Sequence, residues 1–141
     1  MTDQGYAAIS REWVGGDQVR LDLAMEVERV HAHPEVRQDV GRIALKRGPL
    51  VYCLEEADNE VSLNRVRVPD RAPFESRFEP DLLGGVVTLS ANVQADATAD
   101  WAGTLYRSEP TTVEATPIKA IPYFAWDNRE PGEMLVWLRG E

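Results

Sequence analysis

The only cysteine of the chain, Cys53, lies in the stretch IALKRGPLVYCLE at residues 43–55. A cysteine acts as a nucleophile or metal ligand through its thiolate, so a nearby cation, helix N-terminus or metal must lower the pKa of the thiol. The neighbours of Cys53 are Tyr52 and Leu54, and strand alternation places its side chain on the face of Val51. Free cysteines are among the most frequently buried residues. The sequence therefore predicts that Cys53 belongs to the core and that no residue of the chain is catalytic.

The two histidines, His31 and His33, could bind one metal ion, because residues i and i+2 of a strand share a face. Zinc usually takes three or four protein ligands, so Glu35, Asp39 or a distant acid would have to complete the site. Pro34 follows His33 and favours the end of a strand there. We predict exposed or packing histidines and no metal site, with His31 and His33 as the weak candidate ligands.

Carboxylates are abundant, and two of them facing each other across a sugar would indicate a glycosidase. The 24 Asp and Glu residues produce many chance pairs, and no pattern distinguishes one of them. Glu55 and Glu56 are consecutive, so on a strand their side chains point to opposite faces. We expect solvated acids at strand ends.

A loop with the sequence Trp126-Asp127-Asn128-Arg129 combines an aromatic ring with polar side chains. Sugar-binding modules lay sugar rings on exposed aromatic faces and bind the hydroxyls through neighbouring amide, carboxylate and guanidinium groups. Alternatively, Trp126 packs at the end of a hairpin while Asp127 and Asn128 shape the turn. The four residues are the candidate carbohydrate-binding site of the chain.

Strands must position all of these side chains, and their signal is the alternation of apolar and polar residues. Residues 18–26 (QVRLDLAME) predict a half-buried strand. Residues 5–13 predict a second strand, and residues 14–17 (VGGD) a hairpin turn between the two. The apolar face of the first of these strands consists of Val19, Leu21, Leu23 and Met25.

Further along the chain, residues 49–55 carry apolar side chains on both faces, which predicts a strand covered on both sides. Residues 71–85 contain two prolines and end in Gly-Gly, and predict a long loop with at most one helical turn. Residues 119–126 and 134–140 predict a hairpin around the loop DNREPGE. Other predicted strands are residues 42–48, 65–68 and 86–93.

Short strands at this spacing, without a convincing helix, predict an all-β fold. We predict an antiparallel, jelly-roll-like β-sandwich with few or no helices, as a single domain over residues 1–141. Residues 56–65 are polar. The alternative is therefore that residues 1–55 supply strands of one sandwich and residues 60–141 form a second.

The composition excludes some partners. Among 141 residues, 24 acids and 15 bases give a formal charge of -9. Such a surface repels nucleic-acid phosphates and anionic membranes, so we expect neither as a partner. One cysteine permits no internal disulfide, and the sequence leaves the localisation undetermined. Because the chain begins and ends almost directly on predicted strands, we expect a segment cut from a longer protein.

Three stretches together resemble a known family: GYAAISREWVGGDQVRLDLAMEV, GRIALKRGPLVYCLEEADN and IPYFAWDNREPGEMLVWLR. They are similar to the C-terminal region of bacterial β-L-arabinofuranosidase-type glycoside hydrolases, long catalogued as a domain of unknown function. LLGGVV at residues 82–87 fits the same pattern. The resemblance covers nearly the whole chain, in order.

The resemblance implies a catalytic (α/α)6 barrel followed by β-sandwich regions. It also implies a cysteine nucleophile that binds zinc, with further cysteines and a glutamate, all within that barrel. Cys53 does not match the family's nucleophile segment, and the chain has no second cysteine. We therefore expect no cofactor in this chain.

The leading functional hypothesis is a non-catalytic accessory domain that braces the catalytic barrel of its own parent chain and forms a homodimer contact. The alternative is an autonomous carbohydrate-binding module that uses the loop from Trp126 to Arg129. A third hypothesis is a metal-dependent hydrolase built on His31 and His33. Since a face that packs against a barrel would be apolar when exposed, we also expect the chain to self-associate.

Overall fold

The computed structural model describes residues 6–101 and 103–141, and its regular elements are almost all strands. The helical elements within these residues are three-residue 3-10 turns, which confirms the prediction of an all-β fold. The strands are β1 (Val27–His31), β2 (Arg42–Arg47), β3 (Leu50–Glu55), β4 (Val66–Val68), β5 (Glu75–Glu79), β6 (Val86–Asp96), β7 (Val113–Pro122), β8 (Met134–Leu135) and β9 (Leu138–Gly140). The 3-10 turns are η1 (Arg37–Asp39), η2 (Glu56–Asp58), η3 (Leu63–Arg65), η4 (Ala99–Trp101) and η5 (Tyr123–Ala125).

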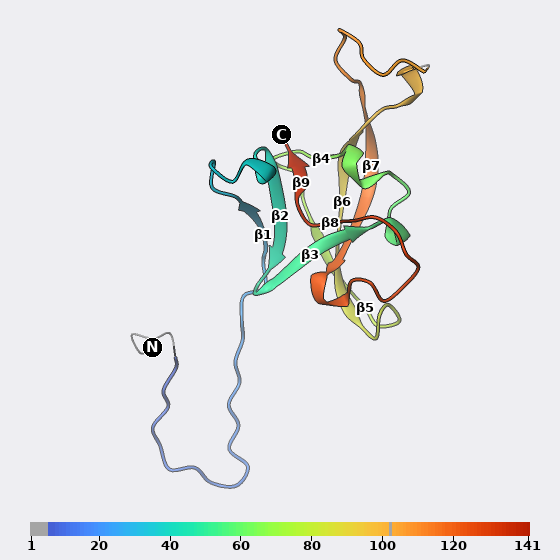
Figure 1. Cartoon of the computed structure of the whole chain (residues 1–141). Helices are drawn as coiled ribbons and strands as arrows, with labels where there is room; N and C mark the ends of the chain where they lie inside the picture. The colour runs from blue at the N-terminus through green and yellow to red at the C-terminus, as the bar shows by residue number, and fades with distance from the viewer. Residues whose placement is uncertain (1–5, 102) are drawn as a thin grey trace.

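Six strands form a sheet that closes on itself, in the order β2-β9-β4-β6-β7-β3 with β3 pairing back to β2 (Figure 1). Strands β1, β5 and β8 add to β2, β6 and β3 respectively. The expectation of two stacked sheets thus differs from the structure, in which hydrogen bonds join all strands into one sheet. Period-two alternation identifies the buried face of a strand but does not say which edges pair, so it could not distinguish a barrel from a sandwich.

The turn between β2 and β3 closes the barrel. Arg47 pairs with Leu50 across two turn residues, Gly48 and Pro49. Gly48 has a φ of 56°, and a positive φ at the first central residue is what a type II′ hairpin turn requires. Met25 packs against the bare Cα of Gly48, where a Cβ would lie 2.4 Å from the Met25 sulfur.

The parallel pair β4–β9 is an exception among otherwise antiparallel neighbours, and it brings two arginines together. Arg67 lies opposite Arg139, a like-charge pairing that is unfavourable by itself. Asp96, at the end of β6, accepts hydrogen bonds from Arg67 at 2.6 Å and from Arg139 at 2.5 Å. Burial raises the pKa of Asp96, but the hydrogen bonds from both guanidinium groups outweigh it and lower the pKa below its usual value.

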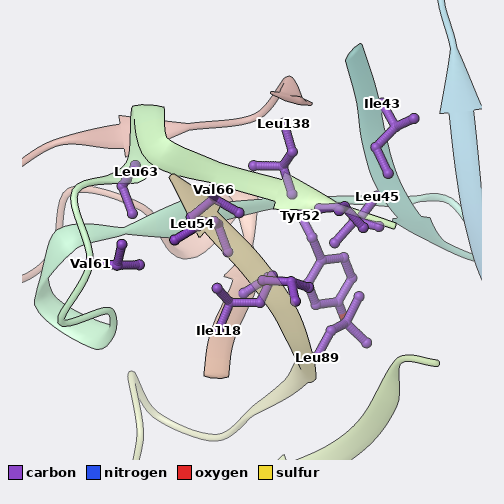
Figure 2. Close-up of a cluster of buried hydrophobic side chains, with 14 residues drawn as sticks. Ile43, Leu45, Tyr52, Leu54, Val61, Leu63, Val66, Leu89, Ile118 and Leu138 are labelled. Atoms are coloured by element: carbon purple, nitrogen blue, oxygen red, sulfur yellow. The ribbon is translucent and has the colours of Figure 1, made fainter. Parts of the chain in front are cut away.

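The barrel interior is filled by a large apolar cluster (Figure 2). Tyr52 and Leu54 of β3 point into this cluster, whereas Cys53 belongs to a second cluster on the other face of the same strand. Both faces of β3 are thus covered from Tyr52 to Glu55, as its sequence predicts, although Val51 is 42% exposed. The second cluster also contains Val86, Ile121 and Ala125, with Leu82, Leu83, Met134 and Val136 packed against it.

The sequence missed β5 and paired β8 with the wrong strand. Residues 75–79 (ESRFE) form a strand against β6, although their charges and the flanking prolines predicted a loop. The predicted hairpin of residues 119–126 with 134–140 is wrong, because β8 pairs with β3 and β9 pairs with β2 and β4. Both errors have one cause: the partner strand, far away in the sequence, decides which segments become strands.

The predicted hairpin at the N-terminus is also wrong in this structure. Residues 6–26, called the N-terminal arm below, contain no strand, and Gly5 lies outside the described residues. The turn itself does form, since the Asp17 amide donates to the Val14 carbonyl at 3.1 Å and Gly16 has a φ of 95°. The arm runs away from the barrel (Figure 1), so its two halves have no adjoining surface on which to pair.

Residues 56–65, the alternative domain boundary, lie against the barrel. Val61 and Leu63 are buried in the large cluster, and the Asn59 side chain is buried as well. The division of the chain into domains stays a prediction. Among the described residues, no helix has the length and apolarity needed to cross a membrane.

Replacing Leu54 by alanine should destabilise the fold strongly. Leu54 is fully buried and lies between Ala120 of β7 and Leu135 of β8, so its loss leaves a cavity. We expect the free energy of unfolding, measured by urea denaturation, to fall by about 2–5 kcal/mol. Val51→Ala is the matched control on the same strand and should cost less than about 1 kcal/mol, because Val51 is 42% exposed. Equal losses for the two variants would contradict this assignment of the core.

Candidate functional site

The candidate sugar-binding loop follows β7 and begins with an aromatic group on the surface. Tyr123 and Trp126 stack with their ring centroids 5.9 Å apart and their planes 17° from parallel. Their exposed fractions are 44% and 38%, and Phe124 between them is 68% exposed. Of the four predicted residues, Trp126 therefore presents an accessible aromatic face.

Asp127 and Asn128 shape the turn. Asp127 has a φ of 63°, a left-handed conformation that Asp tolerates better than most residues, and its amide donates to Glu55 Oε1 at 3.1 Å. Asn128 Nδ2 donates to the carbonyls of Ala125 and Trp126, each at 3.0 Å. The Asn128 amide group and the Asp127 backbone thus hold the loop in place.

Arg129 points into the protein, toward two buried carboxylates. Its Nη2 donates to Asp58 Oδ2 at 2.6 Å and also to Glu55 Oε2. The side chains of Arg129, Glu55 and Asp58 are only 20%, 10% and 6% exposed. Lys119 Nζ approaches Asp58 Oδ1 to 2.8 Å, so two cations face two acids.

Asp58 is ionised within this group, which we call the Arg129 network (Glu55, Asp58, Lys119 and Arg129). Burial raises the pKa of Asp58, but the hydrogen bonds from Arg129 and Lys119 outweigh it and hold that pKa below its usual value. Hydrogen bonding to Asp58 likewise raises the pKa of Arg129. The network therefore favours the charged forms of Asp58 and Arg129, which lie in direct contact.

Asn59 joins the network to the barrel, and sequence reasoning missed it. Its Nδ2 donates to the carbonyls of Glu55 and Lys119 at 2.7 and 3.0 Å, and its Oδ1 accepts from the Lys119 amide at 2.9 Å. The available signal was the polar run EEADN directly after a strand that is apolar on both faces. Solvated acids were expected there, whereas the structure buries Glu55 and the side chain of Asp58.

The hollow beside this loop is small. Its volume is about 110 Å³, and its lining includes Glu55, Glu56, Trp126 and Glu130. Ligand pockets usually measure about 300–1,000 Å³, so a sugar would have to lie on the surface over the aromatic rings instead of inside.

Cys53 is buried, as predicted, with 2% of its surface exposed. Burial raises the pKa of its thiol to about 12, and the negative charge of Glu55 adds to the effect. A thiol with such a pKa is protonated at neutral pH and is a poor nucleophile. The geometry assigns Cys53 a packing role.

The two histidines are not arranged on one strand, because β1 ends at His31. His33 lies beyond it, and its Nδ1 accepts a hydrogen bond from the Glu35 amide at 3.2 Å. Within residues 6–101 and 103–141, no group of three or more His, Cys, Asp or Glu side chains is placed to hold a metal ion.

Comparison with known proteins agrees with the resemblance seen in the sequence. The family model of the glycoside hydrolase family 127 C-terminal domain matches residues 27–139, most of the chain. The chain belongs to this family.

Its relatives are much longer proteins. A non-reducing end β-L-arabinofuranosidase from Bifidobacterium longum subsp. longum is 39% identical over 127 residues, which cover 86% of this chain and 19% of that protein. The crystal structure of a family 127 β-L-arabinofuranosidase from Geobacillus stearothermophilus T6 matches with a TM-score of 0.81 and 46% identity, over 83% of this chain and 18% of that one. Another family 127 β-arabinofuranosidase structure gives a TM-score of 0.72 and 31% identity, over 83% and 17%. The family 127 C-terminal domain thus spans less than a fifth of these relatives.

Replacing Arg129 by methionine should destabilise the domain and change its pH dependence. The change leaves Glu55 and Asp58 buried without their shared partner, and breaking a buried ion pair typically costs about 3–5 kcal/mol. Since the folded-state pKa of Asp58 is depressed, the network stabilises the wild-type fold above the unfolded pKa of about 3.9, and this stabilisation is lost as the pH falls through the lower, folded pKa.

In R129M we therefore expect a lower melting temperature at pH 7 and an onset of acid unfolding at higher pH, both measured by circular dichroism. Arg20→Met is the control, because the Arg20–Asp22 pair is largely exposed and should contribute within about 0.5 kcal/mol. An R129M melting profile that matches wild type across pH 3–7 would show that the network contributes no stability.

Proposed function

We propose that the chain is a non-catalytic accessory domain of a family 127 glycoside hydrolase, which braces the catalytic (α/α)6 barrel of its own polypeptide. The observation that carries the proposal is the family match over residues 27–139, to a domain that occupies under a fifth of its relatives. Those relatives are named as β-L-arabinofuranosidases, and activity on such a sugar is proposed for the whole protein only.

The state of the charged and nucleophilic groups supports a non-catalytic role. The Cys53 thiol has a pKa near 12, and the best-buried carboxylates are paired with Arg129 and Lys119. The zinc that the family resemblance implies does not fit this chain, because a zinc-bound cysteine must be deprotonated and Cys53 is the only cysteine. We place that zinc in the catalytic part of the protein.

Exposed aromatic side chains support a contact with another protein surface. Phe78 and Phe124 are 61% and 68% exposed, and aromatic residues are enriched in protein interfaces. The proposal includes self-association of the chain through such a surface when the catalytic part is absent.

A complementation assay tests the bracing role. The chain would be combined with the Geobacillus relative from which the matched C-terminal segment has been removed, and each part would also be assayed alone on a chromogenic β-L-arabinofuranoside. We expect the activity or heat stability of the truncated enzyme to rise only in the mixture, and an unrelated protein at equal concentration to have no effect.

Three results count against parts of the proposal, two from this assay and one from sedimentation of the chain alone. A mixture that behaves like the truncated enzyme alone, with both parts folded, contradicts bracing. Release of arabinose by the chain alone, lost on Cys53→Ala, contradicts the non-catalytic assignment. A single 15.8 kDa species in sedimentation at high concentration contradicts self-association only.

The stacked pair of Tyr123 and Trp126 favours a second candidate function, carbohydrate binding on its open face. Sugar rings stack on such aromatic faces, and the Arg129 network already holds the loop rigid, so little ordering would be required on binding. The hydroxyl-binding groups would come from the loop edge, because Arg129 is engaged inside the protein.

If the pair binds sugar, soluble arabinan should quench tryptophan fluorescence in a saturable way. Trp126→Ala should abolish the change, since it removes half of the stacked surface. Trp101→Phe is the matched control, because Trp101 lies on the β6–β7 connection, and its variant should retain the quenching. No saturable signal at millimolar sugar would exclude this function.

A further inference from the structure

The N-terminal arm exposes a row of apolar side chains that its own chain does not cover. Val19, Leu21 and Leu23 are 62%, 76% and 65% exposed. They alternate with Arg20 and Asp22, which form an exposed ion pair at 3.0 Å. An exposed leucine is ordinary in isolation, but three apolar side chains at strict two-residue spacing make one continuous strand face.

The arm is also prepared for hairpin formation. Its turn is closed by the Asp17 amide on the Val14 carbonyl, by the Val14 amide on Asp17 Oδ2 at 3.0 Å, and by an ion pair between Arg11 and Asp17 at 3.2 Å. Gly16 supplies the positive φ that such a turn needs. A formed turn without strands on either side indicates that the strands lack a surface to pair on.

The period of the exposed row identifies the kind of partner. A helix groove would require apolar residues three and four positions apart, whereas the arm repeats every two residues. A strand with one apolar and one charged face fits the edge of an antiparallel sheet that has one face buried. The partner is therefore a sheet edge next to an apolar face.

The root of the arm is fixed to the barrel. Met25 packs over Gly48 at the β2–β3 turn, and β1 begins two residues later at Val27. The family match also begins at residue 27, so the arm precedes the segment that defines the C-terminal domain. In the Bifidobacterium relative, about four fifths of the polypeptide lies outside the matched segment. Because the matched family is a C-terminal domain, we expect that polypeptide to precede it.

We propose that residues 6–26 form a β-hairpin that adds to the open edge of an antiparallel sheet in the polypeptide preceding this domain. Residues 18–25 supply the strand whose Val19, Leu21 and Leu23 extend the apolar face of that sheet. The hairpin thereby ties the barrel to its neighbour through backbone hydrogen bonds. The inference rests on the proposed accessory function and names the surface through which it acts.

β5 offers the contrasting case within the same chain. This edge strand beside β6 exposes the charged residues Glu75 and Arg77, and charged residues on an edge strand discourage pairing with another sheet. The apolar face of the arm carries no such charge, which is why we assign the contact to the arm.

Hydrogen exchange measured by mass spectrometry tests the proposal. The 141-residue chain would be compared alone and mixed with the Geobacillus relative lacking its matched segment. In the chain alone, the amides of residues 18–25 should exchange near the intrinsic rate. In the mixture their exchange should be at least about 100-fold slower, because strand pairing protects them.

Two variants test which face of the arm binds. Leu21→Asp with Leu23→Asp should weaken binding about tenfold or more, since two apolar side chains are lost from the contact. Arg20→Ser with Asp22→Ser changes the opposite face and should bind like wild type. Both pairs lie outside the barrel core, and circular dichroism would verify that both variants fold.

Each remaining outcome overturns the proposal in a distinguishable way. Binding without protection of residues 18–25 removes the hairpin and leaves the bracing function standing. Protection that grows with the concentration of the chain alone assigns the row to a second copy. No binding between two folded parts removes both proposals. If the truncated relative does not fold, the same exchange measurement would be made on a chimaera in which this chain replaces the matched segment. Unprotected amides at residues 18–25 of the chimaera would overturn the hairpin proposal.

Discussion

Closure of the sheet is the constraint on which the rest of this structure depends. Six strands pair in a ring only because the Gly48–Pro49 turn brings β2 back onto β3, so the ring has no open edge of its own. Closure makes one interior, and the side chains that fill it come from segments as distant as Ile43 and Leu138. Strand β3 gains a second role from its position, because its outer face receives Cys53 and the segments that cover it. A residue in the middle of β3 therefore supports two layers of packing at once.

The Arg129 network shows how a surface loop can depend on buried charge. One acid, Glu55, ends β3 and the other, Asp58, lies in η2 directly after it, while one cation lies in β7 and the other in the loop after β7. Each group alone would be costly to bury, but here opposite charges pair, and Glu55 also accepts the amide of Asp127, whose backbone is left-handed. The same side chains fully exposed to water would be ordinary surface charges. The lowered pKa of Asp58 and the raised pKa of Arg129 consequently mark a structural clamp, and perturbed values in general do not prove a catalytic site.

The sequence alone predicts the class of this fold well and its pairing poorly. Residues 42–55 read as two strands, and Cys53 as a core residue, because apolar content and alternation are local properties. β5 was missed because its partner β6 decides its conformation. The predicted hairpin at residues 119–140 was wrong because β3 lies between β7 and β8 and pairs with both. Residues 126–129 follow β7 as a loop, but nothing local in the sequence indicates that the Arg129 side chain turns inward. That direction depends on Glu55 and Asp58, more than seventy residues earlier.

The N-terminal arm and the barrel obey the same rule with opposite results. Inside the barrel, every apolar face of β3 from Tyr52 to Leu54 finds a covering layer, and the strand forms. In the arm, a clearer alternation and a finished turn produce no strand, because the backbone has no partner edge and the apolar row has no layer to cover it. Secondary structure in β-proteins is thus a property of pairs of segments. The unpaired strand pattern of the arm is therefore the observation from which we propose a contact with another sheet, and a domain with all its strands paired would offer no such observation.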